Sequence, residues 1–335
     1  MSIPSISDRP SGLSYPPRIV SGVQPSPKLH LGHYFGAMQN LIRLQHEYPG
    51  DTFYLIADQH ALRGSGTHAN LREEIFDLAC TLLAVGLDPN KCILYRQSDL
   101  PECMELVWYL SCVTSGSLLR QGAAQAQDEP PSASDLLYPV LMASDVLCLR
   151  GTIIATGHDQ QANAETVRAI AQRFNRLFGR ELFPMPQARF SGDHVVPGTD
   201  GAKMSTARGN YVGLFEPFYR LQEQVKGIVT DSKGLAEPKD PDACTVCRLF
   251  GLVASTEERE ALAEAYRRGQ IGYEEAKRRL VAALQEYFAE AESRYHDLRR
   301  QPDFIADVFH EGIEQAREEA RYTLDLVREL FGVAA

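Results

Sequence analysis

The chain has 335 residues, of which 44% are hydrophobic and 23% charged, and its net charge is −10 at pH 7. No apolar run approaches the ~20 residues that a membrane-spanning helix needs, and no apolar leader follows a positively charged start, so we expect a cytoplasmic protein without a membrane partner. The negative charge disfavours indiscriminate binding of nucleic acid, and we expect no DNA partner; the length has room for two domains.

Residues 1–17 are rich in serine and proline, and we expect them to form a loose tail. The stretch 18–40 then reads as a short apolar strand, a turn rich in Ser, Gly and Pro, the tetrapeptide HLGH, and an apolar helix pattern. The first N–H groups of a helix lack partners and its dipole attracts negative charge, so this unit predicts an anion site. His30 and His33 are suited to donate to phosphate oxygens, and Gly32 lets a flat ring lie against the backbone.

Apolar strand-like runs alternate with helix patterns from 19 to about 200. The strand candidates are 53–57, 92–95 and 152–155, and one of the helix patterns covers 71–85. This alternation predicts an α/β fold in which a parallel sheet carries helices on both faces. Ligands in such folds sit beyond the carboxyl ends of the strands, which is where the motifs of this chain fall.

Two regions depart from this alternation. Between 101 and 145 two helix patterns flank a polar stretch at 121–134, which indicates a helical insertion with a loop in it. Beyond about 211 the pattern is helical, with apolar positions recurring on one face. We therefore expect a catalytic α/β domain over 18–210 and an all-helical domain over 211–335. The basic residues of the second domain fit a solvated surface and an RNA-binding face equally well.

The seven cysteines are an odd number, and Cys80, Cys112 and Cys148 stand in apolar contexts. They are typical of small buried side chains in a reducing compartment. Cys244 and Cys247 form a C-x-x-C pair, which is half of the usual metal-binding pattern. No second pair lies nearby in sequence, so we expect no metal site.

A second loop adds to the histidine turn. The segment PGTDGAKMSTARGN (197–210) carries Lys203 on a Gly-flanked loop, as a second phosphate contact requires. HLGH and KMST together resemble the paired signatures of class I aminoacyl-tRNA synthetases. The stretches 58–60, 138–145 and 157–160 narrow the resemblance to tryptophanyl-tRNA synthetases of the bacterial type, over about 19–333. This resemblance implies a Rossmann-like catalytic domain and a helical domain that binds the tRNA anticodon.

The resemblance also implies a reaction: ATP activates L-tryptophan to tryptophanyl-adenylate, and tryptophan is transferred to tRNA(Trp). Mg²⁺ accompanies the nucleotide, and the enzyme is a homodimer. No protein nucleophile is needed, because catalysis consists of positioning and stabilisation of phosphate charge. By resemblance His30, His33 and Lys203 are catalytic, and ATP is bound by Gln24, Pro25, Ser26, His30, Gly32, His33, Gly157, His158, Asp159, Val196, Lys203, Met204 and Ser205.

Three side chains of the segment YPVLMASD share one helix face, because Tyr138, Met142 and Asp145 recur at spacings of four and three. By resemblance Asp145 accepts the indole N–H, Tyr138 orients the α-amino or carboxylate group, and Met142 packs on the ring. A buried carboxylate can select tryptophan, because an analogue that lacks the indole N–H leaves the carboxylate without a hydrogen-bond partner. The resemblance completes the tryptophan pocket with Gly22, His60 and Gln160.

The chain departs from the family in two places. The family loop reads KMSKS, whereas this chain has Thr206 in place of the second lysine. The family insertion usually carries a lysine over the ATP phosphates, whereas the region 119–125 has none. Arg120 and Arg208 are the candidate replacements, although the arginine fork is not a point charge.

Four alternatives remain at this stage. The two missing lysines favour an auxiliary paralogue that makes tryptophanyl- or modified tryptophanyl-adenylate, for inhibitor resistance or biosynthesis. The histidine turn also fits a nucleotidyltransferase outside the synthetases, although such enzymes need no helical tRNA-binding domain. A non-catalytic regulator that binds tryptophan or tRNA is a third alternative, and tyrosine as the substrate is a fourth. The joint match at Tyr138, Met142, Asp145 and Gln160 disfavours tyrosine.

Overall fold

The computed structural model describes residues 15–63, 69–123, 131–157, 160–190 and 195–333. Within them, five strands form one parallel sheet in the order β3-β2-β1-β4-β5. The α/β fold with a parallel sheet is therefore confirmed. The strands are β1 Ile19–Val23, β2 Thr52–Ile56, β3 Ile93–Arg96, β4 Ile153–Thr156 and β5 Gln187–Phe190.

Helices connect the strands and make up the C-terminal third. None of the described helices is long and apolar enough to cross a membrane. The helical elements are α1 Leu31–His33, the π-helical η2 Tyr34–Met38, α2 Gln39–Glu47, α3 Asp58–Ala61, α4 Leu71–Ala84, the 3-10 helix η3 Gln97–Asp99, α5 Pro101–Val113, α6 Gly116–Ala123, α7 Ala133–Cys148, α8 Gln161–Phe178, α9 Phe218–Lys226, α10 Thr245–Val253, α11 Thr256–Arg267, α12 Tyr273–Leu298 and α13 Pro302–Phe331.

Each face of the sheet packs in a different core, as the period of two along a strand requires. Tyr54 and Ile56 of β2 belong to a core with α2 and α4, whereas Phe53 and Leu55 belong to one with α5, α7 and α8. All five residues of β2 are buried. This continuous burial explains why the apolar run 53–57 predicts a central strand.

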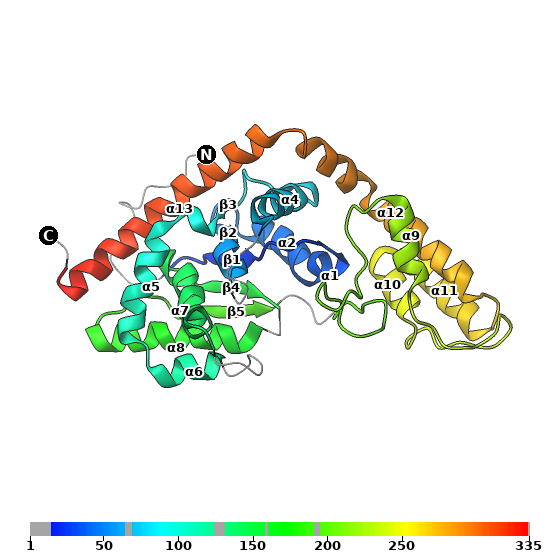
Figure 1. Cartoon of the computed structure of the whole chain (residues 1–335), viewed down its shortest axis with the longest axis horizontal. Helices are drawn as coiled ribbons and strands as arrows, with labels where there is room; N and C mark the ends of the chain where they lie inside the picture. Colours follow the sequence, from blue (N-terminus) through cyan, green and yellow to red (C-terminus); the bar gives the residue numbers. More distant parts are fainter. Residues whose placement is uncertain (1–14, 64–68, 124–130, 158–159, 191–194, 334–335) are drawn as a thin grey trace.

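The last helix covers the open edge of the sheet. α12 and α13 run along one side of the molecule, from the lobe of α9–α11 to the far end of the sheet (Figure 1). Gly312 of α13 lies so close to β3 that an added Cβ would stand 2.0 Å from the carbonyl oxygen of Leu94. Only glycine permits this approach, and the helix protects an edge strand that would otherwise expose unpaired backbone groups.

Several details were not predicted. β5 was not expected, because Gln187–Phe190 is short and only partly buried. α6 continues to Ala123, so the first residues of the polar stretch 121–134 are helical rather than loop, and residues 124–130 lie outside the described part. Residues 1–14 of the expected tail also lie outside it, whereas Tyr15 donates a 2.7 Å hydrogen bond to the carbonyl oxygen of Leu182.

Candidate active site

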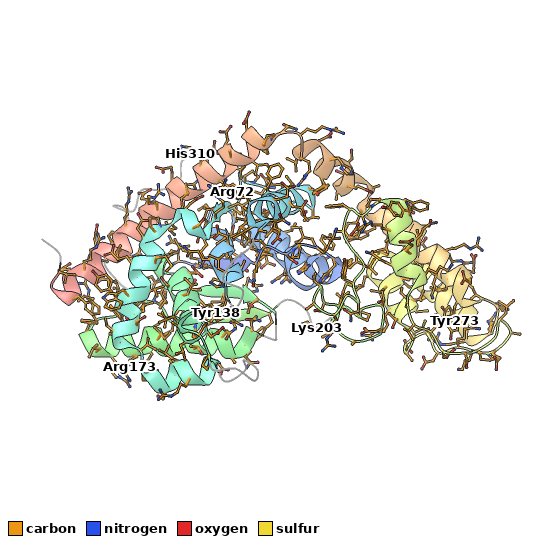
Figure 2. The ribbon with its side chains drawn as sticks, viewed as in Figure 1. Arg72, Tyr138, Arg173, Lys203, Tyr273 and His310 are labelled. Atoms are coloured by element: carbon orange, nitrogen blue, oxygen red, sulfur yellow. The ribbon has the colours of Figure 1, made fainter. Side chains whose placement is uncertain are left out.

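A cavity of about 750 Å³ opens beyond the carboxyl ends of β1, β2 and β4. Its walls come from the HLGH turn, α7, the start of α8 and the loop that carries Lys203. In Figure 2 Tyr138 lies beside the sheet and Lys203 lies in the loop region between the sheet and the helical lobe. The predicted residues that line the cavity are Gly22, Gln24, His30, Gly32, His33, His60, Tyr138, Met142, Asp145, Gly157, Gln160, Val196, Lys203, Met204 and Ser205.

Four predicted ATP-site residues are not among the described lining residues. Pro25 is buried behind the turn, and Ser26 borders a separate cavity of about 250 Å³. His158 and Asp159 lie outside the described residues. The cavity therefore brings together the histidine turn, the lysine loop and the α7 face, which are distant in the sequence.

The histidine turn fixes the orientation of two imidazoles. The ring centroids of His30 and His33 are 3.8 Å apart, and the backbone N–H of His30 donates to Nδ1 of His33 over 3.2 Å. Because Nδ1 accepts, the proton of neutral His33 is on Nε2, where it is available as a donor. A Cβ on Gly32 would lie 2.9 Å from the ring of His30, so glycine is needed for the ring to lie against the backbone, as expected.

Both histidines are uncharged near neutral pH. Burial lowers the pKa of His30 to about 3, with a smaller contribution from the neighbouring His33, and lowers the pKa of His33 to about 4. Nδ1 of His30 is buried and has no hydrogen-bond partner among the described residues. The backbone N–H groups of Leu31 and His33 already donate to the carbonyl oxygens of Val212 and His30. The turn therefore offers neutral imidazole donors to a bound phosphate.

The other end of the cavity is built around Asp145. Its side chain is 4% exposed and lies on α7 with Tyr138 and Met142, which all face the cavity as predicted. Nε2 of Gln97 donates to both carboxylate oxygens, at 2.9 and 3.0 Å, and Nε2 of His60 lies 2.9 Å from Oδ2. The side chains of Gln97 and His60 thus hold the carboxylate in place at the cavity wall.

Gln97 was missed in the sequence. Its Oε1 accepts from the backbone N–H of Gln59, so one amide connects the end of β3 to α3 and to Asp145 on α7. The signal was available, because Gln97 directly follows a buried strand at the ligand-binding edge of the sheet. Asn40 and Asn163 also line the cavity and were missed, and helix periodicity gives no signal for either.

The lysine loop approaches the histidine turn from the opposite side. Met204 packs over Gly32, with its Cβ 3.4 Å from the position of an added glycine Cβ, and the backbone of Lys203 pairs with Pro197. Asn210 holds the loop, since its Oδ1 accepts from Ser205 N–H and its Nδ2 donates to the carbonyl of Lys203. Lys203 is the only lysine or arginine among the described lining residues.

The structure shows whether other side chains take the place of the two lysines that the family pattern has and this chain lacks. Thr206 lines the cavity and donates its hydroxyl to the carbonyl of Lys28 over 3.3 Å, so a neutral contact replaces the second lysine. Arg120 and Arg208 are exposed and are not among the described lining residues, so neither replaces a missing cation in this arrangement. The stretch 119–125 is described only in part.

A metal held by protein ligands does not fit the described site. Asp145 is the only carboxylate among the lining residues, and Gln97 and His60 occupy its oxygens. Among the described residues there is also no group of three or more His, Cys, Asp or Glu side chains placed to hold a metal ion.

Comparison with known proteins agrees with this geometry. The model of the family "tRNA synthetases class I (W and Y)" matches residues 14–289. Tryptophan–tRNA ligases of Fusobacterium nucleatum and Rhodopirellula baltica are 38% and 39% identical, covering 94% of this chain and 98% and 99% of theirs. A solved structure of tryptophanyl-tRNA synthetase from Campylobacter jejuni, complexed with ADP and tryptophan, is 34% identical and superposes with a TM-score of 0.86 over 94% of this chain and 99% of its own. The chain therefore belongs to the tryptophanyl-tRNA synthetase family of class I aminoacyl-tRNA synthetases.

Proposed function

We propose that this protein activates L-tryptophan with ATP and transfers it to tRNA(Trp). The substrate carboxylate attacks the α-phosphorus, pyrophosphate leaves, and the resulting adenylate esterifies a tRNA hydroxyl. One observation carries the proposal: a single cavity joins the neutral histidine turn, Lys203 and the Asp145 end of α7. The enzyme needs only to position the reactants and to stabilise charge on phosphate oxygens.

At the phosphate end, Nε2–H of His33 donates to the ATP phosphates, and Lys203 neutralises the departing pyrophosphate. Gln24 and Gly157 border the nucleotide, and Pro25, Ser26, His158 and Asp159 remain predicted members of the same site. Mg²⁺ enters with ATP, held by phosphate oxygens rather than by a protein ligand set.

At the tryptophan end, Asp145 accepts the indole N–H as a further donor beside Gln97 and His60. The His60 ring lies edge-on to Tyr138, with centroids 5.1 Å apart, which supports the proposed role of Tyr138 in orienting the substrate. A ring without an N–H would leave a carboxylate lone pair unpaired in a buried place, which is the physical basis of selection.

The proposed reaction implies L-tryptophan and tRNA(Trp) as partners, and we propose that the protein is cytoplasmic. We predict that the helical domain over 211–335 contacts the tRNA anticodon; in the structure its last helix, α13, packs on β3. We also propose a homodimer formed through the insertion. Trp108 and Met104 of α5 are 70% and 43% exposed, and Leu137 of α7 is 39% exposed, which are unusual exposures for apolar side chains unless a partner covers them.

A second candidate is an auxiliary synthetase with a slower first step or a modified indole substrate. The single cationic residue of the described cavity wall and the neutral Thr206 favour it, because fewer charges oppose the developing phosphate charge.

Tryptophan-dependent exchange of labelled pyrophosphate into ATP tests the proposal. We expect exchange with tryptophan and without tRNA, followed by charging of tRNA(Trp) when it is added. Absence of exchange, with ATP and tryptophan still bound, would contradict it. A panel of indole amino acids separates the candidates, since plain tryptophan with ordinary turnover excludes the auxiliary role.

A further inference from the structure

Two cysteines in the helical lobe form a cluster that adenylate formation does not use. Cys244 is the N-cap residue of α10, and Cys247 lies one turn further along the same helix. Both side chains are partly exposed, whereas Cys80, Cys92, Cys103 and Cys148 are buried. Cys247 also borders a second cavity, of about 860 Å³, with Pro197 and Arg248. Small reagents in solvent therefore reach the pair.

The sulfur of Cys244 lies at the start of α10, and its thiol donates to the hydroxyl oxygen of Tyr266, a fully buried residue of α11, over 3.7 Å. Hydrogen bonds from the thiol of Cys247 and from the backbone N–H groups of Cys247 and Val246 lower the pKa of the Cys244 thiol. Donors to a sulfur atom, together with the positive end of a helix, stabilise the thiolate.

Charged side chains act on the two cysteines in opposite ways. The positive charge of Lys277 on α12 interacts with Cys244, whereas the negative charge of Asp242 raises the pKa of Cys247. Tyr273 packs on Tyr266, with centroids 5.9 Å apart, and lies in the helical lobe (Figure 2). Hydrogen bonding lowers the pKa of the Cys244 thiol to about 6, whereas the neighbouring Cys244 raises the pKa of Cys247 above its usual value. One cysteine is thus a nucleophile and the other a protonated donor at neutral pH.

We propose that Cys244 and Cys247 are a redox-active dithiol that closes reversibly to a disulfide. In a C-x-x-C pair at the start of a helix, one thiol attacks the oxidant. The second thiol lies close enough to react with the oxidised first cysteine and form a disulfide. This inference does not depend on the proposed synthetase activity.

With hydrogen peroxide as the oxidant, the chemistry balances in two steps. The thiolate of Cys244 attacks one peroxide oxygen, the O–O bond breaks, and the hydroxide that leaves takes up a proton to form water. The thiol of Cys247 then attacks the resulting sulfenic acid, an S–S bond forms, and a second water leaves. Two thiols are oxidised to one disulfide and one peroxide is reduced to two waters. A dithiol reductant reverses the change.

The test uses the full chain carrying Cys112→Ser, which removes the exposed cysteine on α5. Equimolar peroxide is expected to give a Cys244–Cys247 disulfide, located by peptide mass, which dithiothreitol reverses. In Cys247→Ser the reaction stops at a sulfenic acid on Cys244 that dimedone traps. In Cys244→Ser, Cys247 loses the neighbour that raises its pKa, and it is expected to react no faster than an ordinary thiol and to form no intramolecular disulfide.

Alkylation with iodoacetamide gives an independent measurement. Cys244 is expected to react with a midpoint near pH 6, and Cys247→Ser moves that midpoint upward, toward the value of about 8.5 of an ordinary thiol. Three results would overturn the proposal: a Cys244 midpoint at or above pH 8, equal oxidation of Cys244 and of the buried cysteines, or stoichiometric zinc or iron held by the pair in the isolated protein.

Discussion

Asp145 has a buried carboxylate with no lysine or arginine beside it among the described lining residues. Its two oxygens depend on hydrogen bonds with Gln97 and His60. Unpaired lone pairs in such a place are costly, so the residue discriminates strongly between partners that donate and partners that do not.

Asp145→Asn is expected to lower kcat/KM for tryptophan about 100-fold or more, because the amide presents a donor where the indole N–H needs an acceptor. Pyrophosphate exchange at varied tryptophan and ATP measures this, and KM for ATP should stay within about twofold. Asp307→Asn, at an exposed position of α13, is the matched control. An unchanged preference for tryptophan over phenylalanine would refute the pocket assignment.

The buried histidines make stability depend on pH. In the unfolded chain they take up protons below about pH 6.5, whereas in the folded protein His33 and His30 do so only near pH 4 and pH 3. The unfolded state therefore binds more protons between these values, and the free energy of unfolding falls as the pH is lowered through this window.

We expect the wild type to lose more stability between pH 7 and pH 5 than His33→Asn, by on the order of 1 kcal/mol. Urea unfolding at the two pH values measures the difference. His46→Asn, at an exposed position on α2, should keep the wild-type slope. Identical slopes for His33→Asn and the wild type would mean that His33 has the same pKa in the folded and the unfolded protein.

At the scale of elements, the short segment after β1 alternates between two helical states. An α-helical turn leads into the π-helical η2, and regular α-helix resumes at Gln39. Such π segments are rare and often lie at functional sites. Here η2 separates the histidine turn from α2, and the residues Gly36 and Ala37 within it line the cavity.

The lysine loop is the second element with a direct consequence for turnover. Lys203→Ala is expected to lower the rate of pyrophosphate exchange about 100- to 1000-fold, by analogy with the loss of one preorganised donor to developing charge. Binding of ATP should change far less, because the effect arises as pyrophosphate departs. Arg208→Ala, on the same loop but outside the described cavity wall, should stay within about twofold. A similar loss in both variants would show that the loop acts through its overall charge.

Elements differ in how far the sequence predicts them. β1, β2 and β3 were predictable because they are apolar runs that are buried along most of their length, and β2 is buried at every residue. β4 was predictable from its apolar run, although only Ala155 in it is buried. The α7 face was predictable because a helix has a fixed period. β5 was not, since an edge strand with Gln187 and Arg189 has no apolar run. Gln97 was overlooked, because its role depends on Asp145, 48 residues further along the chain.

The whole molecule is held together by contacts that no local pattern reveals. Helical periodicity predicts α13 as an amphipathic helix. It does not predict that small residues such as Gly312 let this helix pack closely against the sheet. There the carboxylate of Glu319 bridges two arginines, with Oε2 lying 2.7 Å from Nη1 of Arg18 and 2.9 Å from Nη2 of Arg150. Arg18 precedes β1, and Arg150 follows α7, which carries Asp145. One buried ion network thus joins both ends of the chain to the frame of the site.

Glu319→Ala is expected to destabilise the protein by about 3–5 kcal/mol, because it removes the carboxylate that pairs with two largely buried guanidinium groups. Arg18 keeps a hydrogen bond to the carbonyl oxygen of Leu149 and an ion pair with Asp51 over 3.8 Å, whereas Nε of Arg150 has no hydrogen-bond partner among the described residues. Thermal and urea unfolding measure the loss. Glu314→Ala breaks the exposed pair with Arg317 on the same helix and should cost less than about 1 kcal/mol. If the two variants unfold alike, α13 is held by its apolar face alone, and the network contributes nothing to its position against the sheet.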